Sequence, residues 1–185
     1  MKLKHFLAIA IIGLVSCAST PNTVSNVAPD ADFSKYSTYG FFSPLATDEQ
    51  GYESIVSSFL KVATAQELDR RGLKYAESPD LKVNFYINTE EKIRTRSVPT
   101  MQSYYGTYYG YRRRFGYDPF YSYQAYETRV DQYTEGTLNI DVVDVKAQKL
   151  VWEGMASGRV RDSAIINMEQ SIDSAVAAIM QSFPR

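Results

Sequence analysis

Two short runs of alternating apolar and polar residues, at 135–144 and 150–156, constrain the fold of this chain more than any other feature. The apolar residues repeat every second position in each run: Leu138, Ile140 and Val142, then Leu150 and Trp152. This period is typical of strands with one buried face. Because only five residues separate the runs, we expect an antiparallel hairpin whose turn begins at Asp144 and whose Trp152 lies in the core.

Two further strands are predicted upstream of the hairpin. The run 33–42 is aromatic and β-prone, with Tyr36 expected in the core, and residues 81–87 alternate between apolar and polar side chains. A helix between these strands implies a right-handed crossover, so they should pair in parallel, whereas the later hairpin must be antiparallel.

Two helices are predicted from periodicity and capping signals. The first, at 51–71, follows Thr47 and Gln50, which fit a capping box, and it ends at Gly72. The second begins at Asp162 or Ser163. Its apolar face consists of Ile165, Ile172, Val176, Ile179 and Phe183.

The resulting order is β-α-β-loop-β-β-α. It predicts the α/β (α+β) fold class: a two-layer sandwich in which two helices cover one face of a mixed β-sheet. The single domain is expected at 33–185, with a tyrosine-rich insertion at about 100–127.

The N-terminus carries the features of a signal peptide, assigned to 1–16. Its ten-residue apolar run, 6–15, is about half as long as a membrane-spanning helix. The run ends in 14–17, Leu-Val-Ser-Cys, which resembles the lipobox of bacterial lipoproteins. That resemblance implies diacylglycerol and an N-linked acyl chain on Cys17. An ordinary secretory signal with an incidental cysteine is the alternative.

The segment 17–32 comprises Cys17, whose lipidation the lipobox resemblance implies, and a flexible tether, which we predict because residues 18–32 are rich in Ser, Thr, Asn and Pro. Lipoproteins of this kind stay in the inner membrane mainly when Asp follows the cysteine. Here Ala18 follows it, so we expect the outer membrane, with the domain facing the periplasm.

Three blocks of the sequence resemble the bacterial lipoprotein family defined by domain of unknown function 4136. They lie at 32–39, at 79–83, and from 135–138 through the Leu-Val-Trp-Glu-Gly run at 150–154. The resemblance spans nearly all of the chain after Asp32. The departures are phenylalanine where Trp is expected after the first strand, and the tyrosine-rich insertion. The resemblance implies an envelope lipoprotein with a mixed α/β domain, and it identifies no catalytic residue in this chain.

The chain contains one cysteine and one histidine, both at or before position 17. Catalysis by Ser-His-Asp or Cys-His groups is therefore excluded for the remainder, as are disulfides and the usual zinc and copper sites. We expect no metal and no cofactor, because Asp141 and Asp144 should point to opposite faces of their strand. The formal charge of −1 includes Lys2 and Lys4, so residues 17–185 carry −3. An acidic exported domain argues against nucleic acid as a partner.

Carboxylates offer an enzymatic alternative. A glycosidase needs two of them in a cleft, and the available candidates are Glu90, Glu91, Asp131, Glu135 and Glu153. The sequence places no two of them together, so an envelope hydrolase is a lesser alternative.

The segment 104–126 holds nine tyrosines and three consecutive arginines. Tyrosine supplies rigid contact area, and arginine suits phosphate or carboxylate groups. The candidate binding surface consists of Tyr104, Tyr105, Tyr108, Tyr109, Tyr111, Arg112, Arg113 and Arg114. Its partner would be peptidoglycan, lipopolysaccharide or another envelope protein, and an insertion without a ligand is the alternative.

These observations favour a membrane-anchored lipoprotein with a non-enzymatic structural, accessory or binding role. A glycan- or lipopolysaccharide-binding module that uses the tyrosine-rich segment is the second hypothesis.

Overall fold

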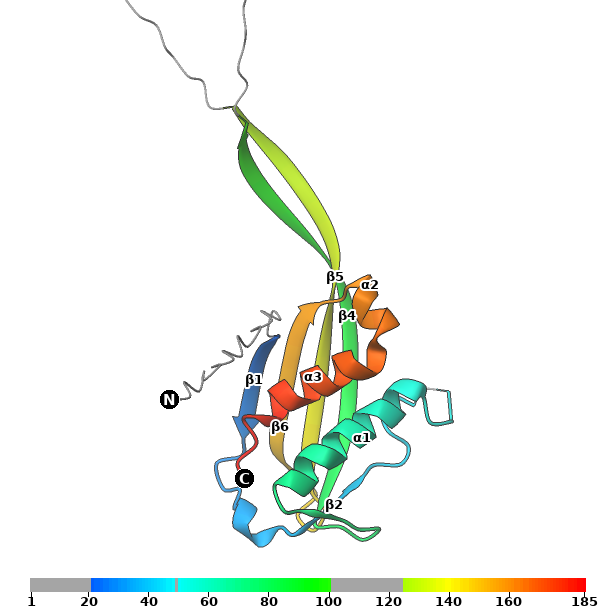
Figure 1. Cartoon of the computed structure of the whole chain (residues 1–185). Coiled ribbons are helices and arrows are strands. Elements are labelled where there is room, and N and C mark those ends of the chain that lie inside the picture. The colour runs from blue at the N-terminus through cyan, green and yellow to red at the C-terminus, as the bar shows by residue number, and fades with distance from the viewer. Residues whose placement is uncertain (1–20, 49, 101–124) are drawn as a thin grey trace, which may run out of the picture.

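The computed structural model describes residues 21–48, 50–100 and 125–185. These form one six-stranded mixed sheet in the order β1-β6-β5-β4-β2-β3 (Figure 1). The strands are β1 (Asn22–Val27), β2 (Thr38–Phe41), β3 (Lys74–Tyr75), β4 (Leu81–Thr100), β5 (Ala125–Asp144) and β6 (Lys149–Arg159). The helices are the short 3₁₀ helix η1 (Phe33–Lys35), α1 (Ile55–Arg70), α2 (Asp162–Ile166) and α3 (Met168–Met180).

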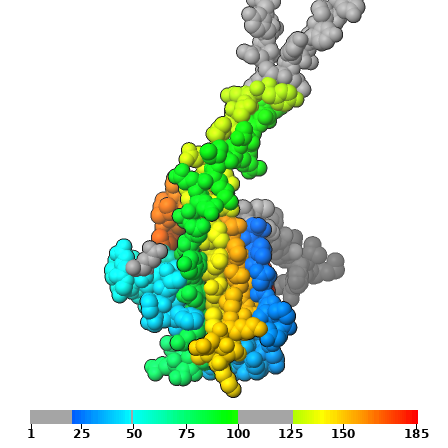
Figure 2. Space-filling view, turned by 180° about the vertical axis from the view of Figure 1, so that it is seen from behind, coloured from blue at the N-terminus to red at the C-terminus, as the bar shows by residue number. Residues whose placement is uncertain are grey.

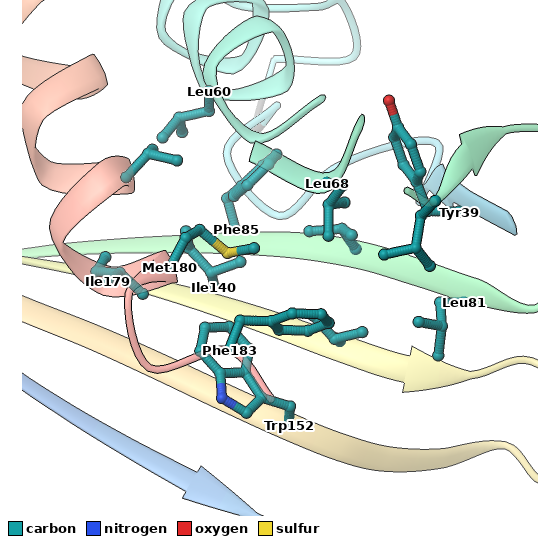
Figure 3. Close-up of a cluster of buried hydrophobic side chains, with 14 of the residues drawn as sticks. Tyr39, Leu60, Leu68, Leu81, Phe85, Ile140, Trp152, Ile179, Met180 and Phe183 are labelled. Atoms are coloured by element: carbon teal, nitrogen blue, oxygen red, sulfur yellow. The ribbon is translucent and has the colours of Figure 1, made fainter. Parts of the chain in front are cut away.

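Helices α1 and α3 lie side by side on one face of the sheet, so the structure has the two layers that the sequence predicts (Figure 1). The core between the layers contains Leu60 from α1, Phe85 and Ile140 from the central strands, and Ile179 from α3 (Figure 3). All four side chains are fully buried. The fold-class prediction, an α+β sandwich with a mixed sheet, is confirmed.

The β5–β6 hairpin is antiparallel, as predicted, and the backbone N–H of Ala147 donates to Oδ1 of Asp144 in its turn, at 2.9 Å. A bulge follows the turn, because Val142 pairs with Trp152 whereas Val143 pairs with Leu150. The extra residue breaks the alternation. As a result Val151 and Trp152 are both buried, and the prediction that Leu150 shares the face of Trp152 is wrong, since Leu150 is 44% exposed.

Strand β2 pairs in parallel with β4, which confirms the predicted crossover. The predicted strand at 33–42 is too long, however. Asp32 caps η1 by accepting from the backbone N–H of Ser34 at 3.0 Å, and the extended chain starts only at Thr38. Tyr36, between the two, is buried as predicted.

Helix α1 begins later than predicted. The capping box at Thr47 and Gln50 does not form, and Ser54 is the N-cap, with its side chain accepting from the N–H of Ser57 at 3.0 Å. The predicted end is correct, because Gly72 follows the C-cap with a φ of +83°. The predicted C-terminal helix is two helices that meet at Asn167, and Ile165 is 60% exposed in the first of them.

Two corrections concern the segments expected to be irregular. Residues 22–27 of the predicted tether form β1, which pairs antiparallel with the edge of β6 from Asn22–Ser157 to Val27–Trp152. The predicted insertion is also shorter than expected, because β4 continues to Thr100 and β5 starts at Ala125.

The extended parts of β4 and β5 form a two-stranded arm. Strand β6 ends at Arg159, opposite Glu135, and the arm continues beyond this level for ten residue pairs, from Glu91–Thr134 to Thr100–Ala125. At about 3.3 Å per residue its length is about 33 Å. Figure 1 shows this twisted hairpin leaving the end of the sheet.

Candidate functional site

An apolar groove of about 330 Å³ lies at the end of the domain from which the arm departs. This volume is at the lower end of the range for ligand pockets, about 300–1,000 Å³. The groove runs between the helical layer and strands β4, β5 and β6. Its apolar lining includes Val56, Leu60, Ile87, Leu138, Ala156, Val160, Ile165, Met168 and Ile172, and Pro21 lines it as well.

The break between α2 and α3 keeps the groove open. The later residues of α3, Val176 and Ile179, pack into the core. Helix α2, in contrast, follows directly where the chain leaves β6 after Arg159, and it has no buried residue. Ile165 on α2 and Ile87 on β4 therefore stay 60% and 44% exposed while lining the groove. Exposed apolar side chains that converge on one concave site are typical of a binding surface.

The arm continues the floor of this groove, and its two faces differ. Side chains alternate along a strand, so the face that begins at Ile87 and Leu138 continues toward the tip. Beyond Glu91 and Gln132, which are joined by a 2.9 Å hydrogen bond, this uncharged face consists of Ile93, Thr95, Ser97, Pro99, Tyr126, Thr128 and Val130. Ile93, Tyr126 and Val130 are 70%, 64% and 63% exposed.

The opposite, charged face of the arm contains Lys92, Arg94, Arg96, Glu127, Arg129, Asp131 and Tyr133, together with the partly buried Val98 near its tip. Lys92 Nζ lies 2.8 Å from Glu135 Oε2, and this hydrogen bond raises the pKa of Lys92. The guanidinium of Arg159 lies 5.0 Å from the ring centroid of Tyr133. One face of the arm therefore suits water and the other suits an apolar or interfacial environment.

The acidic residues in the blocks that carry the family resemblance have structural roles at the opposite end of the sheet. Tyr36 donates from its hydroxyl to Oδ2 of buried Asp144 at 2.8 Å, and the backbone N–H of Ala147 lowers the pKa of Asp144. Oδ2 of Asp80 accepts from the backbone N–H and the hydroxyl of both Ser37 and Thr38, at 2.8–3.1 Å. The backbone bond from Ser37 is the largest cause of its lowered pKa. The Asp80 bonds hold the start of β2 to the start of β4, and the Tyr36–Asp144 bond ties the segment before β2 to the end of β5.

Among the carboxylates considered for hydrolysis, Glu90 and Glu135 are direct cross-strand partners on β4 and β5. Glu153 has an acidic cross-strand neighbour as well, Asp141. Both lie on the helix-free face of the sheet, which Figure 2 shows from behind. Burial and the charge of Glu153 raise the pKa of Asp141. Asn26 on β1 donates to Glu153 Oε2 at 3.3 Å. Asp141 and the buried Asp144 point to opposite faces, as predicted.

The residues predicted to carry the anchor and the binding surface lie outside the described residues. These are Cys17 and the set Tyr104, Tyr105, Tyr108, Tyr109, Tyr111, Arg112, Arg113 and Arg114. Within the described ranges, no three His, Cys, Asp or Glu side chains are grouped so that they could hold a metal ion. None of the described helices is long and apolar enough to span a membrane.

Sequence reasoning missed both the groove and the arm. The groove depends on how α2 leaves the sheet, which local periodicity does not encode. The arm has a weak signal, because Ile87 and Ile93 share the parity of Leu81, Val83 and Phe85. The intervening Thr89 and Glu91 interrupt the apolar alternation, so the strand prediction stops early.

Comparison with known proteins adds a fold relationship. A PDZ domain protein from Parabacteroides distasonis is 12% identical over 89% of this chain, with a TM-score of 0.53, and the chain spans 36% of that protein, about a third of its length. The PelC dodecamer from Paraburkholderia phytofirmans is 11% identical over 88% of this chain and 98% of its own, with a TM-score of 0.42. The first of these similarities describes the fold alone and does not bear on activity.

None of the curated proteins matches the sequence. A family match, in contrast, covers residues 23–185, which include every described element except the first residue of β1. The predicted resemblance to domain of unknown function 4136 is thereby confirmed. The chain belongs to the family described as Domain of unknown function (DUF4136).

Proposed function

We propose that this chain is a lipid-anchored protein of the bacterial envelope whose non-enzymatic role is to bind an acyl chain in the apolar groove. The anchor is diacylglycerol and an N-linked acyl chain on Cys17, held in the outer membrane with the domain facing the periplasm. The observation that carries this proposal is the groove itself, because its apolar lining includes Pro21, four residues after Cys17.

The chemistry of the groove supports an acyl ligand. Its aliphatic walls lie among exposed isoleucines, and each methylene that leaves water for such an environment contributes about 0.8 kcal/mol. The lipid attached at Cys17 would keep the groove near a membrane, where acyl chains are the most abundant apolar groups. Ligands of this kind need no catalytic or metal-binding side chain.

The anchor is tested by Cys17→Ala. The variant should lose metabolic palmitate labelling and should accumulate as precursor or detach from the membrane fraction. The chain with Cys17 intact serves as the reference. Processing, labelling and membrane association that persist in the variant would contradict the anchor.

The groove is tested by photo-crosslinking in cells fed a diazirine fatty acid. Crosslinks should map to the floor of the groove at Leu138 and Ala156, which lie on central strands beneath the helices. Ile165→Lys should reduce them, because Ile165 lines the groove. Val62→Lys is the control, since Val62 on α1 is 52% exposed and is not part of the groove lining. Equal crosslinking in both variants would contradict acyl binding in the groove.

A second candidate is the glycan- or lipopolysaccharide-binding role of the tyrosine-rich segment. The observation that favours it is the position of Thr100 and Ala125, which flank the segment at the far end of the arm. Retention on purified peptidoglycan or lipopolysaccharide that is lost when 101–124 are replaced by a Gly/Ser linker would support this role.

A further inference from the structure

The start of β1 and the arm lie at the same end of the sheet (Figure 1). Asn22 pairs with Ser157, Ser157 with Thr137, and Thr137 with Asn88, so all four residues lie at one level across the sheet. From this level β4 continues for twelve residues to Thr100, about 40 Å at 3.3 Å per residue. The chain that precedes Asn22 therefore leaves the domain beside the base of the arm.

We propose that the arm lies along the membrane that holds the lipid on Cys17, with its uncharged face against the lipid headgroups and its charged face toward water. This inference rests on the proposed anchor. The partner of the uncharged face is a phospholipid surface. This proposal is supported by the length of the connection to Cys17, by the length of the arm, and by the side chains on its two faces.

The short connection to Cys17 prevents the arm from pointing away from the membrane. Four residues separate Cys17 from Asn22, and the five residue-to-residue steps between these two positions span at most about 18 Å in a fully extended chain. With the arm pointing away, this connection would have to run back along the sheet from the level of Asn88 to at least that of Leu81. Those seven residues of β4 span about 23 Å, which exceeds the reach of the connection.

The arm is also too long and too polar to enter the bilayer upright. From the level of Asn88 to Thr100, β4 spans about 40 Å, which exceeds the reach of the connection by about 20 Å and would place much of the arm inside a bilayer whose hydrocarbon layer is about 30 Å thick. Arg94, Arg96 and Asp131 would then lose water, and the edges of a two-stranded ribbon would leave backbone groups without partners in lipid. The remaining orientation places the arm along the surface.

The distribution of apolar side chains decides which face meets the lipid. Ile93, Val130 and Tyr126 are exposed on the uncharged face, and Tyr is a residue that favours membrane interfaces. Ile165, which lines the groove together with Ile87 at the base of the arm, is 60% exposed, and its neighbour Ile166 is 79% exposed. A lipid surface would cover this set together, and it would also stabilise a two-stranded ribbon that is marginal alone in water.

The sole cysteine of the chain makes a site-specific test direct. The mature lipoprotein is reconstituted in phosphatidylethanolamine–phosphatidylglycerol vesicles, and single cysteines introduced by Ile93→Cys or Val130→Cys carry a polarity-sensitive fluorophore. The matched control is Arg94→Cys, which is adjacent in sequence but lies on the charged face. Lys146→Cys, in the turn at the opposite end of the sheet, reports bulk water.

Labels at positions 93 and 130 should shift to shorter emission wavelength and be quenched by phospholipids brominated in their acyl chains. The labels at 94 and 146 should show little of either effect. A shift at 93 without lipid quenching would indicate a protein partner and overturn the proposal. Water-like emission at both 93 and 130 would also overturn it.

Flotation of the same vesicles separates this failure from failure of the anchor. Protein that floats with the vesicles while its label at 93 stays in water contradicts the arm orientation and leaves the anchor intact. Protein that does not float contradicts the anchor on Cys17 and the orientation derived from it.

Discussion

Gly154 follows Trp152 by two residues on the same face of β6 and lies beneath its indole ring. A Cβ at Gly154 would meet Cη2 of Trp152 and Cγ2 of Ile179 well inside van der Waals contact distance. Glycine is therefore required where α3 packs on the sheet. Together with the bulge that buries both Val151 and Trp152, this close approach explains the Val-Trp-Glu-Gly run within the third block of the family resemblance.

Gly154→Ala should destabilise the domain by about 1–3 kcal/mol, the usual cost of forcing extra volume into a packed core. Gly158→Ala is the control on the same strand, because no described atom lies within 4 Å of the position that its Cβ would occupy. Its change in stability should stay within about 0.5 kcal/mol. Urea unfolding of both variants measures the difference. Equal midpoints would show that α3 tolerates a methyl group at position 154.

Trp152→Ala should lower the free energy of unfolding by about 3–5 kcal/mol, the range for truncating a large buried aromatic side chain. The indole ring is fully buried and packs edge-on against Phe183, with ring centroids 5.1 Å apart (Figure 3). Leu150→Ala, at a 44% exposed position next to the bulge, is the control and should have a small effect. Thermal unfolding reads out both variants, and similar shifts would contradict the assigned bulge.

Acid should weaken the domain through Asp80. Four hydrogen bonds from Ser37 and Thr38 lower its pKa in the folded protein below the unfolded value of about 3.9. Its contribution to stability is therefore complete above the unfolded pKa and is lost as the pH falls through the folded pKa. Asp80→Asn should destabilise most at neutral pH and should flatten the acid-side decline.

The measurement for this prediction is the unfolding midpoint of both proteins between about pH 7 and about pH 3, which covers the upper part of the carboxylate titration. Asp173→Asn, an exposed position on α3, is the control and should preserve the wild-type pH dependence. Parallel curves for wild type and Asp80→Asn would mean that another carboxylate dominates.

Replacing residues 101–124 with a short Gly/Ser linker should leave the melting temperature nearly unchanged. All buried hydrophobic residues of the described chain come from 33–85 and 140–183, and the replacement begins beyond the arm. The free-energy cost of closing a loop changes by only about 0.6 kcal/mol for each doubling of the loop length. A large fall in melting temperature would show that this segment packs on the core.

The sequence by itself determined the elements that contain their own signal. Alternation located the β5–β6 hairpin and the first part of β4, Gly72 located the end of α1, and the β-α-β order predicted the parallel β2–β4 pair. Asp144 was correctly assigned to the turn. Its side chain accepts from the backbone N–H of Ala147, only three residues later, so the interaction is local and can be predicted from the sequence. Apart from the bulge that exposes Leu150, the local pattern and the final structure agree in each case.

The tertiary structure alone decided the features that have no local signal. β1 has no buried residue, and it forms a strand because the edge of β6 offers backbone partners to residues 22–27. The arm lacks a buried face, so its pairing follows from the register set in the core and not from hydrophobic alternation. The groove forms where α2 and α3 diverge at Asn167. Each of these depends on pairing or packing between segments far apart in the chain, which periodicity within one segment does not specify.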